Sequence, residues 1–172
     1  MPKPLPWYWR FIGVDPGESG GLVALDHEGI FAIDPIPPTE RNIWEWFQQH
    51  TKLDANNKCR TIALIERISP AIFGIKKSSA SKLYGSYMSL RMSLIAKGIP
   101  FEEIDAKDWQ SILGIERRKK EESTSRWKSR LLAKAQQLYP DFPLWSVPET
   151  KEQQLMVCDA LLIATVCFRK HR

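Results

Sequence analysis

The sequence predicts an α/β fold in which a mixed five-stranded sheet carries helices on its faces. Two observations indicate this class. The first is that three short apolar runs, separated by turn residues, lie between residues 11 and 36. The second is that segments with apolar residues at helical spacing alternate with segments at strand spacing over the rest of the chain. The 172 residues suffice for one domain with a sizeable core. We expect an irregular N-terminal arm at residues 1–10 and a single domain at residues 11–172.

The first three strands are expected to form an antiparallel meander. FIGVD (11–15) is a short apolar strand, and the PGESGG that follows is a turn rich in Gly and Pro. A second strand, GLVALD (21–26), is joined by the tight turn HEG to a third, IFAIDPI (30–36). Turns this short connect neighbouring antiparallel strands.

Helices and strands alternate in the rest of the chain. Thr39 caps the first helix, Ile43, Trp44 and Phe47 lie at helical spacing within it, and Gly98 ends the second helix. The expected elements are a helix at 37–53, a strand at 59–68, a helix at 78–98, a strand at 99–106, and helices at 106–114, at 121–139 and from about 150 onward. The tryptophans on helices are expected in the core: Trp44, Trp109 and Trp127. This order is that of the ribonuclease H-like fold, in which the fourth strand pairs beside the first.

Composition and charge narrow the classes of function. The net charge of +5 is compatible with a nucleic-acid partner. The three cysteines have no metal-ligand spacing, and their odd number indicates reduced thiols. The N-terminus lacks the apolar segment of a signal peptide, and no run approaches 18 apolar residues. We therefore expect a cytoplasmic protein without a membrane span.

Three carboxylates are embedded in apolar residues. Asp15 closes the first strand in IGVD, Glu66 lies near the end of the fourth in ALIE, and Asp159 lies in the last helix in VCDALLIA. Taken singly, each could equally face solvent or cap a helix. Three converging acids would repel one another without a cation. Mg²⁺ or Mn²⁺ takes such oxygen ligands, and two ions about 4 Å apart can drive phosphodiester hydrolysis.

Several motifs together resemble a known family. FIGVDPGESGGLVALD, ALIERI, the run from KLYGSY to KDWQSILG, and CDALLIA occur in the order found in RuvC-type Holliday junction resolvases, especially the phage-related branch. The resemblance covers most of residues 11–165. It implies a homodimeric endonuclease of the ribonuclease H-like superfamily that binds branched DNA, resolves four-way junctions by phosphodiester hydrolysis and uses Mg²⁺ or Mn²⁺.

The resemblance also implies the catalytic residues. By motif match, Asp15, Glu66 and Asp159 are the catalytic metal ligands. The family carries a further acid or a His three or four residues before the last Asp, where this chain has Met156 and Leu155. Glu152, on the same helical face, is a further candidate ligand. Its distance of about 10.5 Å along the helix favours a role at the helix N-terminus, or at most a contact to a second metal through water.

Candidate DNA-binding residues lie in two segments. Nine Lys or Arg and four Asp or Glu lie between Lys107 and Lys134, and this local excess equals the net charge of the chain. A solvated face of mixed charge is the alternative interpretation. Phe73 either stacks on a base at the junction centre or anchors a loop. The candidate phosphate contacts are Lys76, Lys77, Arg117, Arg118, Lys119 and Lys120.

Other functions are compatible with these features. Met156 and Leu155 favour a catalytically weakened junction-binding protein of the same fold. An RNA-processing nuclease of the ribonuclease H-like fold is a further alternative. An ATPase of the actin and sugar-kinase type shares the strand-one turn but needs two such domains, whereas this chain has room for one.

Overall fold

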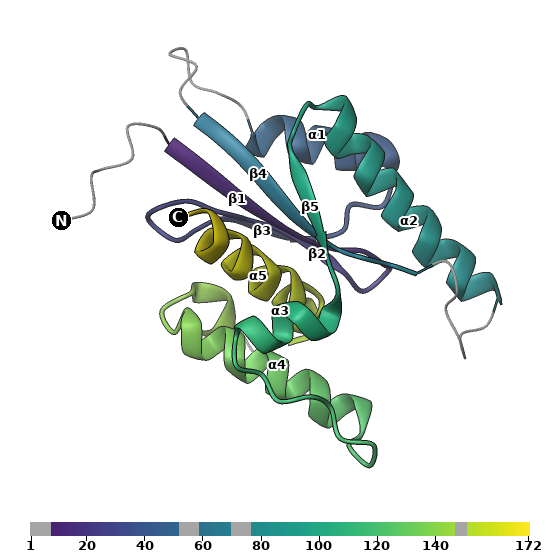
Figure 1. Ribbon diagram of the computed structural model, residues 1–172, viewed down its shortest axis with the longest axis vertical. Helices are drawn as coiled ribbons and strands as arrows, with labels where there is room; N and C mark the ends of the chain where they lie inside the picture. The colour runs from purple at the N-terminus through teal and green to yellow at the C-terminus, as the bar shows by residue number, and fades with distance from the viewer. Residues whose placement is uncertain (1–7, 52–58, 70–76, 147–150) are drawn as a thin grey trace.

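The computed structural model describes residues 8–51, 59–69, 77–146 and 151–172. Its centre is a five-stranded sheet with the strand order β3-β2-β1-β4-β5 (Figure 1). The first three strands are antiparallel, whereas β4 is parallel to both β1 and β5. The predicted mixed sheet and ribonuclease H-like strand order are therefore confirmed. The strands are β1 (Tyr8–Asp15), β2 (Gly21–Leu25), β3 (Ile30–Pro35), β4 (Cys59–Glu66) and β5 (Phe101–Ile104).

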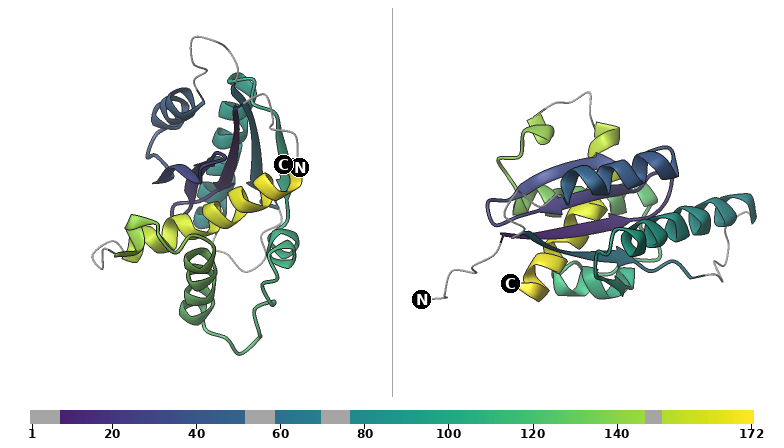
Figure 2. Two further views of the ribbon diagram at one scale, coloured as in Figure 1. Left: turned by 90° about the vertical axis from the view of Figure 1, so that its left-hand side faces the viewer. Right: turned by 90° about the horizontal axis from the view of Figure 1, so that it is seen from above.

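Helices cover both faces of the sheet (Figure 2). On one face, α1 (Glu40–His50) and α2 (Lys77–Ala96) enclose a core with alternate residues of β1, β2 and β4. On the other face, α5 (Lys151–His171) packs directly against the sheet, and α3 (Ala106–Ile112) and α4 (Thr124–Leu138) pack against α5. A short 3₁₀ helix, η1 (Pro143–Ser146), precedes α5. Within the described ranges, no helix has both the length and the apolar character to cross a membrane.

Two glycines let α5 lie unusually close to the sheet. A Cβ atom at Gly13 of β1 would lie only 2.1 Å from the backbone oxygen of Ala160. At Gly21 of β2, a Cβ atom would lie 3.0 Å from the Cα atom of Val157. Because neither strand carries a side chain at the crossing, the backbone of α5 occupies that space. This contact fixes the axial position of α5 next to the end of β1.

The helix-capping predictions are confirmed. The Thr39 side chain accepts a hydrogen bond from the backbone N–H of Asn42 at the start of α1. After α2, Gly98 adopts a φ of 66° and donates its N–H to Ile95, while Ile99 donates to Leu94. These two bonds form the Schellman motif that ends many helices at a glycine.

The N-terminal boundary and one tryptophan differ from the sequence prediction. Residues 8–10 are not part of an irregular arm, because they extend β1 by pairing with the start of β4. Residues 1–7 lie outside the described part of the chain. Trp109 and Trp127 are buried as predicted, but Trp44 is 36% exposed. The buried face of α1 is formed by Ile43, Trp46 and Phe47 at i, i+3 and i+4 spacing, which leaves Trp44 outside it beneath the Lys97 ammonium.

Candidate active site

Asp15, Glu66 and Asp159 lie at one edge of the sheet. Asp15 is the last residue of β1 and Glu66 the last of β4, and these parallel neighbours pair up to Val14 and Ile65. Side chains alternate along a strand, so Asp15 shares the α5 face with Gly13, and Glu66 shares it with the core residue Leu64. Asp159, 8% exposed, faces them from α5.

Burial and mutual repulsion shape the acidity of this cluster. Burial is the largest cause that raises the pKa of Asp15 well above its usual range, and the charges of Asp159 and Glu66 add to it. Burial also raises the pKa of Glu66 to about 7, although a hydrogen bond from Trp109 acts in the opposite direction. The site is therefore rich in negative charge that the protein only partly compensates.

Lys128 of α4 supplies the compensating charge. Its Nζ donates to Oδ2 of Asp159 over 2.5 Å. Burial opposes the charge of Lys128, but the neighbouring carboxylates of Asp159 and Asp15 outweigh it and raise the pKa of the lysine. In the sequence, Lys128 lies within the basic segment between Lys107 and Lys134 and is not marked there as a site residue. The overlooked feature was its position three and four residues before Leu131 and Leu132, on the apolar face of α4.

Trp109 of α3 orients one carboxylate. Its indole Nε1 donates to Oε2 of Glu66 over 2.8 Å, and the side chain is 1% exposed. The sequence predicted a buried core position for this tryptophan but not its polar contact. A buried indole usually finds a hydrogen-bond partner, and here that partner belongs to the carboxylate cluster. The contact fixes the orientation of the Glu66 side chain.

The donor chemistry of the cluster fits a hard divalent cation. Among the residues that the structure describes, no group of three or more His, Cys, Asp or Glu side chains is arranged as a ready-made metal site. The three carboxylates nevertheless interact electrostatically, and one ammonium compensates only part of their charge. Carboxylate oxygens are the ligands that Mg²⁺ and Mn²⁺ prefer. A bound cation would relieve the repulsion that raises the pKa values of Asp15 and Glu66.

The other candidate residues either do not belong to this cluster or lie outside the described part of the chain. Glu152 is exposed in the first turn of α5, about 10.5 Å of helix rise before Asp159. Leu155 and Met156 occupy half-buried positions between them. Lys77 is the first residue of α2, whereas Lys76 and Phe73 lie outside the described residues. The basic run lies in the exposed segment between α3 and α4: Arg117, Arg118, Lys119 and Lys120.

Comparison with solved structures identifies the fold. Thermus thermophilus RuvC in complex with a Holliday junction substrate superposes with a TM-score of 0.53 over 89% of both chains at 12% sequence identity. The chain has a RuvC-like fold. A second Thermus thermophilus RuvC structure matches with a TM-score of 0.49 over 89% of both chains at 13% identity. No protein-family model and no curated protein matches the sequence. At these identities the likeness concerns the fold alone.

Proposed function

We propose that this protein is a metal-dependent, structure-specific endonuclease that binds four-way DNA junctions and hydrolyses their phosphodiester bonds. The observation that carries the proposal is the meeting of Asp15, Glu66 and Asp159 at one edge of a RuvC-like sheet. The solved neighbour with this fold holds a Holliday junction substrate, which supports the same substrate class here. The affiliation with the phage-related branch is part of the proposal and depends on the sequence motifs alone.

Each residue of the site has a role in this proposal. Asp15, Glu66 and Asp159 hold Mg²⁺ or Mn²⁺, which, when bound, activates water and stabilises the leaving oxygen. Trp109 keeps the Glu66 carboxylate in one orientation through its indole N–H. Lys128 pairs with Asp159, and its side chain remains one-third exposed. Its ammonium can therefore also donate to an incoming phosphate.

A junction-cleavage assay with metal titration tests the proposal. Asp15→Asn, Glu66→Gln and Asp159→Asn should each reduce the cleavage rate by at least about a hundredfold, as expected when the catalytic metal ion loses one of its ligands. Binding of the junction in EDTA should persist, because DNA is held mainly by Lys and Arg. Asp108→Asn, an exposed acid in the first turn of α3, is the matched control. Cleavage near the wild-type rate by any of the three variants would exclude that residue as a ligand.

A catalytically weakened junction-binding protein is the second candidate. The Lys128–Asp159 ion pair and the apolar residues at 155 and 156 favour it. Met156 lies one helical turn before Asp159, so Met156→Asp adds a carboxylate on the same helix face. If the protein is an active nuclease that binds its second metal ion weakly, this substitution should lower the Mn²⁺ concentration needed for half-maximal cleavage. If wild type and Met156→Asp both bind the junction but cleave it at no metal concentration, the second candidate is favoured.

Parallel cleavage assays on duplex RNA distinguish the junction nuclease from the RNA-processing alternative.

A homodimer is part of the proposed function, because symmetric cleavage of a junction needs two sites. The described outer face of α2 exposes Met92 and Ile95, at 56% and 55%. We expect a second copy to cover them. Sedimentation velocity of wild type and Ile95→Lys tests this: the substitution should shift a dimer toward the monomer, and a monomeric wild type contradicts it.

A further inference from the structure

We propose that the segment between α3 and α4, residues 115–123, is a preorganised phosphate-contact loop. In this assignment Arg117, Lys119 and Lys120 contact the DNA backbone, whereas Arg118, Glu122 and Arg130 form a clamp that holds the loop in place. We call these last three residues the loop clamp. The inference deepens the proposed function, since it takes DNA as the ligand.

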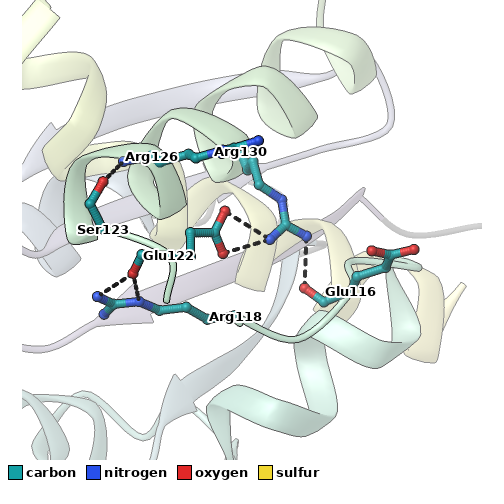
Figure 3. Close-up of polar contacts among 6 residues, drawn as sticks. All are labelled: Glu116, Arg118, Glu122, Ser123, Arg126 and Arg130. Atoms are coloured by element: carbon teal, nitrogen blue, oxygen red, sulfur yellow. Dashed lines mark hydrogen bonds and ion pairs between the residues drawn. The ribbon is translucent and has the colours of Figure 1, made fainter. Parts of the chain in front are cut away.

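Arg130 ties the two ends of the loop to α4 (Figure 3). One terminal nitrogen, Nη1, lies 3.1 and 2.8 Å from the two carboxylate oxygens of Glu122. The other, Nη2, donates to the backbone carbonyl of Glu116 over 2.9 Å. The Glu122 side chain is only 7% exposed, so its carboxylate is shielded from solvent, whereas the Arg130 side chain is 32% exposed. A single guanidinium thus connects positions 116 and 122 to the helix.

Arg118 closes the loop on itself (Figure 3). Its Nε and Nη2 donate to the backbone carbonyl of Glu122 over 3.1 and 3.0 Å. Nη2 also donates to Oγ1 of Thr124, in the first turn of α4, over 3.1 Å. The planar guanidinium suits such convergent contacts. Arg118 therefore works within the loop, unlike the three basic residues around it.

The three other basic residues of the loop are open to solvent. Arg117, Lys119 and Lys120 are exposed and make no ion pair with any residue in the described ranges. The loop joins α4 at Ser123, which caps the helix, and Lys128 lies just over one turn further along. Lys128 reaches Asp159, so the loop and the carboxylate cluster adjoin the same end of α4. Phosphates near the cluster would thus pass close to the loop.

The clamp and simple electrostatics predict opposite effects for one substitution. Removing a negative charge from a DNA-binding loop should tighten binding if charge alone matters. Removing the Glu122 charge should weaken binding if the clamp matters, because the loop must then be ordered when DNA binds. Glu121 provides a matched control, since it is the exposed neighbouring acid and makes no ion pair in the described part of the chain.

The experiment measures the affinity of the full chain for a labelled four-way junction and a mixed-sequence duplex over a range of salt concentrations. We expect Glu122→Gln to weaken binding roughly two- to tenfold, as for the ordering of one or two side chains, with an unchanged salt slope. Glu121→Gln should bind as tightly as wild type or more tightly. Arg118→Ala should also weaken binding without changing the slope, whereas Lys119→Ala with Lys120→Ala should lower the slope by about two.

Limited trypsin digestion gives a readout that does not depend on DNA. Cleavage after Arg117 or Lys119 should accelerate in Glu122→Gln and not in Glu121→Gln, at a temperature well below the thermal midpoint of both variants. Tighter binding by Glu122→Gln, a slope lowered by about one in Arg118→Ala, or equal digestion of both glutamine variants overturns the inference. Binding without cleavage of the junction counts only against the proposed catalysis, while absence of any DNA binding by the wild type overturns both.

Discussion

At the scale of single residues, the carboxylate cluster combines three acids with one ammonium and one indole N–H. Lys128 pairs with Asp159, and Trp109 donates to Glu66. Asp15 is left with burial and two like charges that outweigh the opposing effect of Lys128. In the absence of another cation, the repulsion is relieved at the lowest free-energy cost when one of the buried carboxylates binds a proton.

This charge imbalance predicts that the stability of the metal-free protein falls as pH rises. The pKa of Glu66 rises from 4.5 to about 7 on folding, so the folded state holds this proton more tightly than the unfolded state. The stabilisation is fully present below pH 4.5 and is lost as pH rises through 7, on the order of 3 kcal/mol at about 1.4 kcal/mol per unit. The raised pKa of Asp15 acts in the same direction.

Urea unfolding in EDTA between pH 4.5 and pH 8 checks this expectation. Asp15→Asn and Glu66→Gln should flatten the decline and make the metal-free protein more stable than wild type at pH 8. Asp108→Asn should retain the full decline, because this side chain is exposed. A wild-type stability that stays level or increases over this interval argues against the buried, repelling cluster.

Trp109 provides a second prediction at this scale. Trp109→Phe keeps a buried ring but removes the N–H that orients Glu66, so metal affinity should fall about tenfold or more, as for other partners of metal ligands. Mn²⁺ binding, followed by electron paramagnetic resonance, measures it directly. Trp46→Phe is the matched control: Trp46 Nε1 donates to Asp34 over the same 2.8 Å on the opposite face of the sheet. An equal effect of both substitutions contradicts a local role for Trp109.

At the scale of elements, the contact of α5 with β1 and β2 determines where Asp159 lies. Backbone atoms of Ala160 and Ala164 approach Gly13, so no side chain of β1 separates the helix backbone from the strand at this crossing. The position of Asp159 opposite Asp15 is therefore a consequence of a missing Cβ atom. Gly13 supports the site without touching any of its polar groups.

Gly13→Ala should displace α5 and cost about 3 kcal/mol or more, because a Cβ at 2.1 Å from a backbone oxygen cannot be accommodated by a side-chain movement. Gly85→Ala is the control, since a Cβ there meets no atom of the described structure within 4 Å apart from its chain neighbours and its own helix backbone. In the middle of α2 it should instead stabilise the protein by about 0.5–1 kcal/mol. Chemical denaturation of both variants compares them. Equal effects would show that the close approach is not strained by a methyl group.

Elements defined by local residues were predictable, and those defined by distant partners were not. Thr39 and Gly98 act through neighbouring backbone groups, so both helix ends were identified from sequence. Tyr8 to Arg10 gained their strand conformation from pairing with β4, some fifty residues away. The sequence showed that Asp15 and Glu66 end adjacent strands, but the side chains that reach these acids from α3 and α4 depend on packing.

At the scale of the whole molecule, the sheet separates two apolar cores, and only one of them adjoins the carboxylate cluster. The core beneath α1 and α2 contains no part of the carboxylate cluster. The other core is built around α5, which is buried from Val157 to Cys167. The candidate active site and this second core therefore share one helix, and Asp159 lies within its buried stretch.

The burial of α5 has a kinetic consequence. Cys158 and Cys167 lie on it, and burial raises the pKa of Cys167 to about 12 and that of Cys158 further still. Since the thiolate is the form that attacks thiol-labelling reagents, both side chains should stay unlabelled until α5 leaves the sheet. In a Cys59→Ser background, the rate at which Cys158 and Cys167 are labelled on heating should equal the rate at which cleavage activity is lost. Loss of activity before labelling would show that the carboxylate cluster is disrupted while α5 is still packed on the sheet. If the two rates agree, heat inactivates this protein by releasing α5, because the helix that carries Asp159 cannot leave the sheet without opening the core.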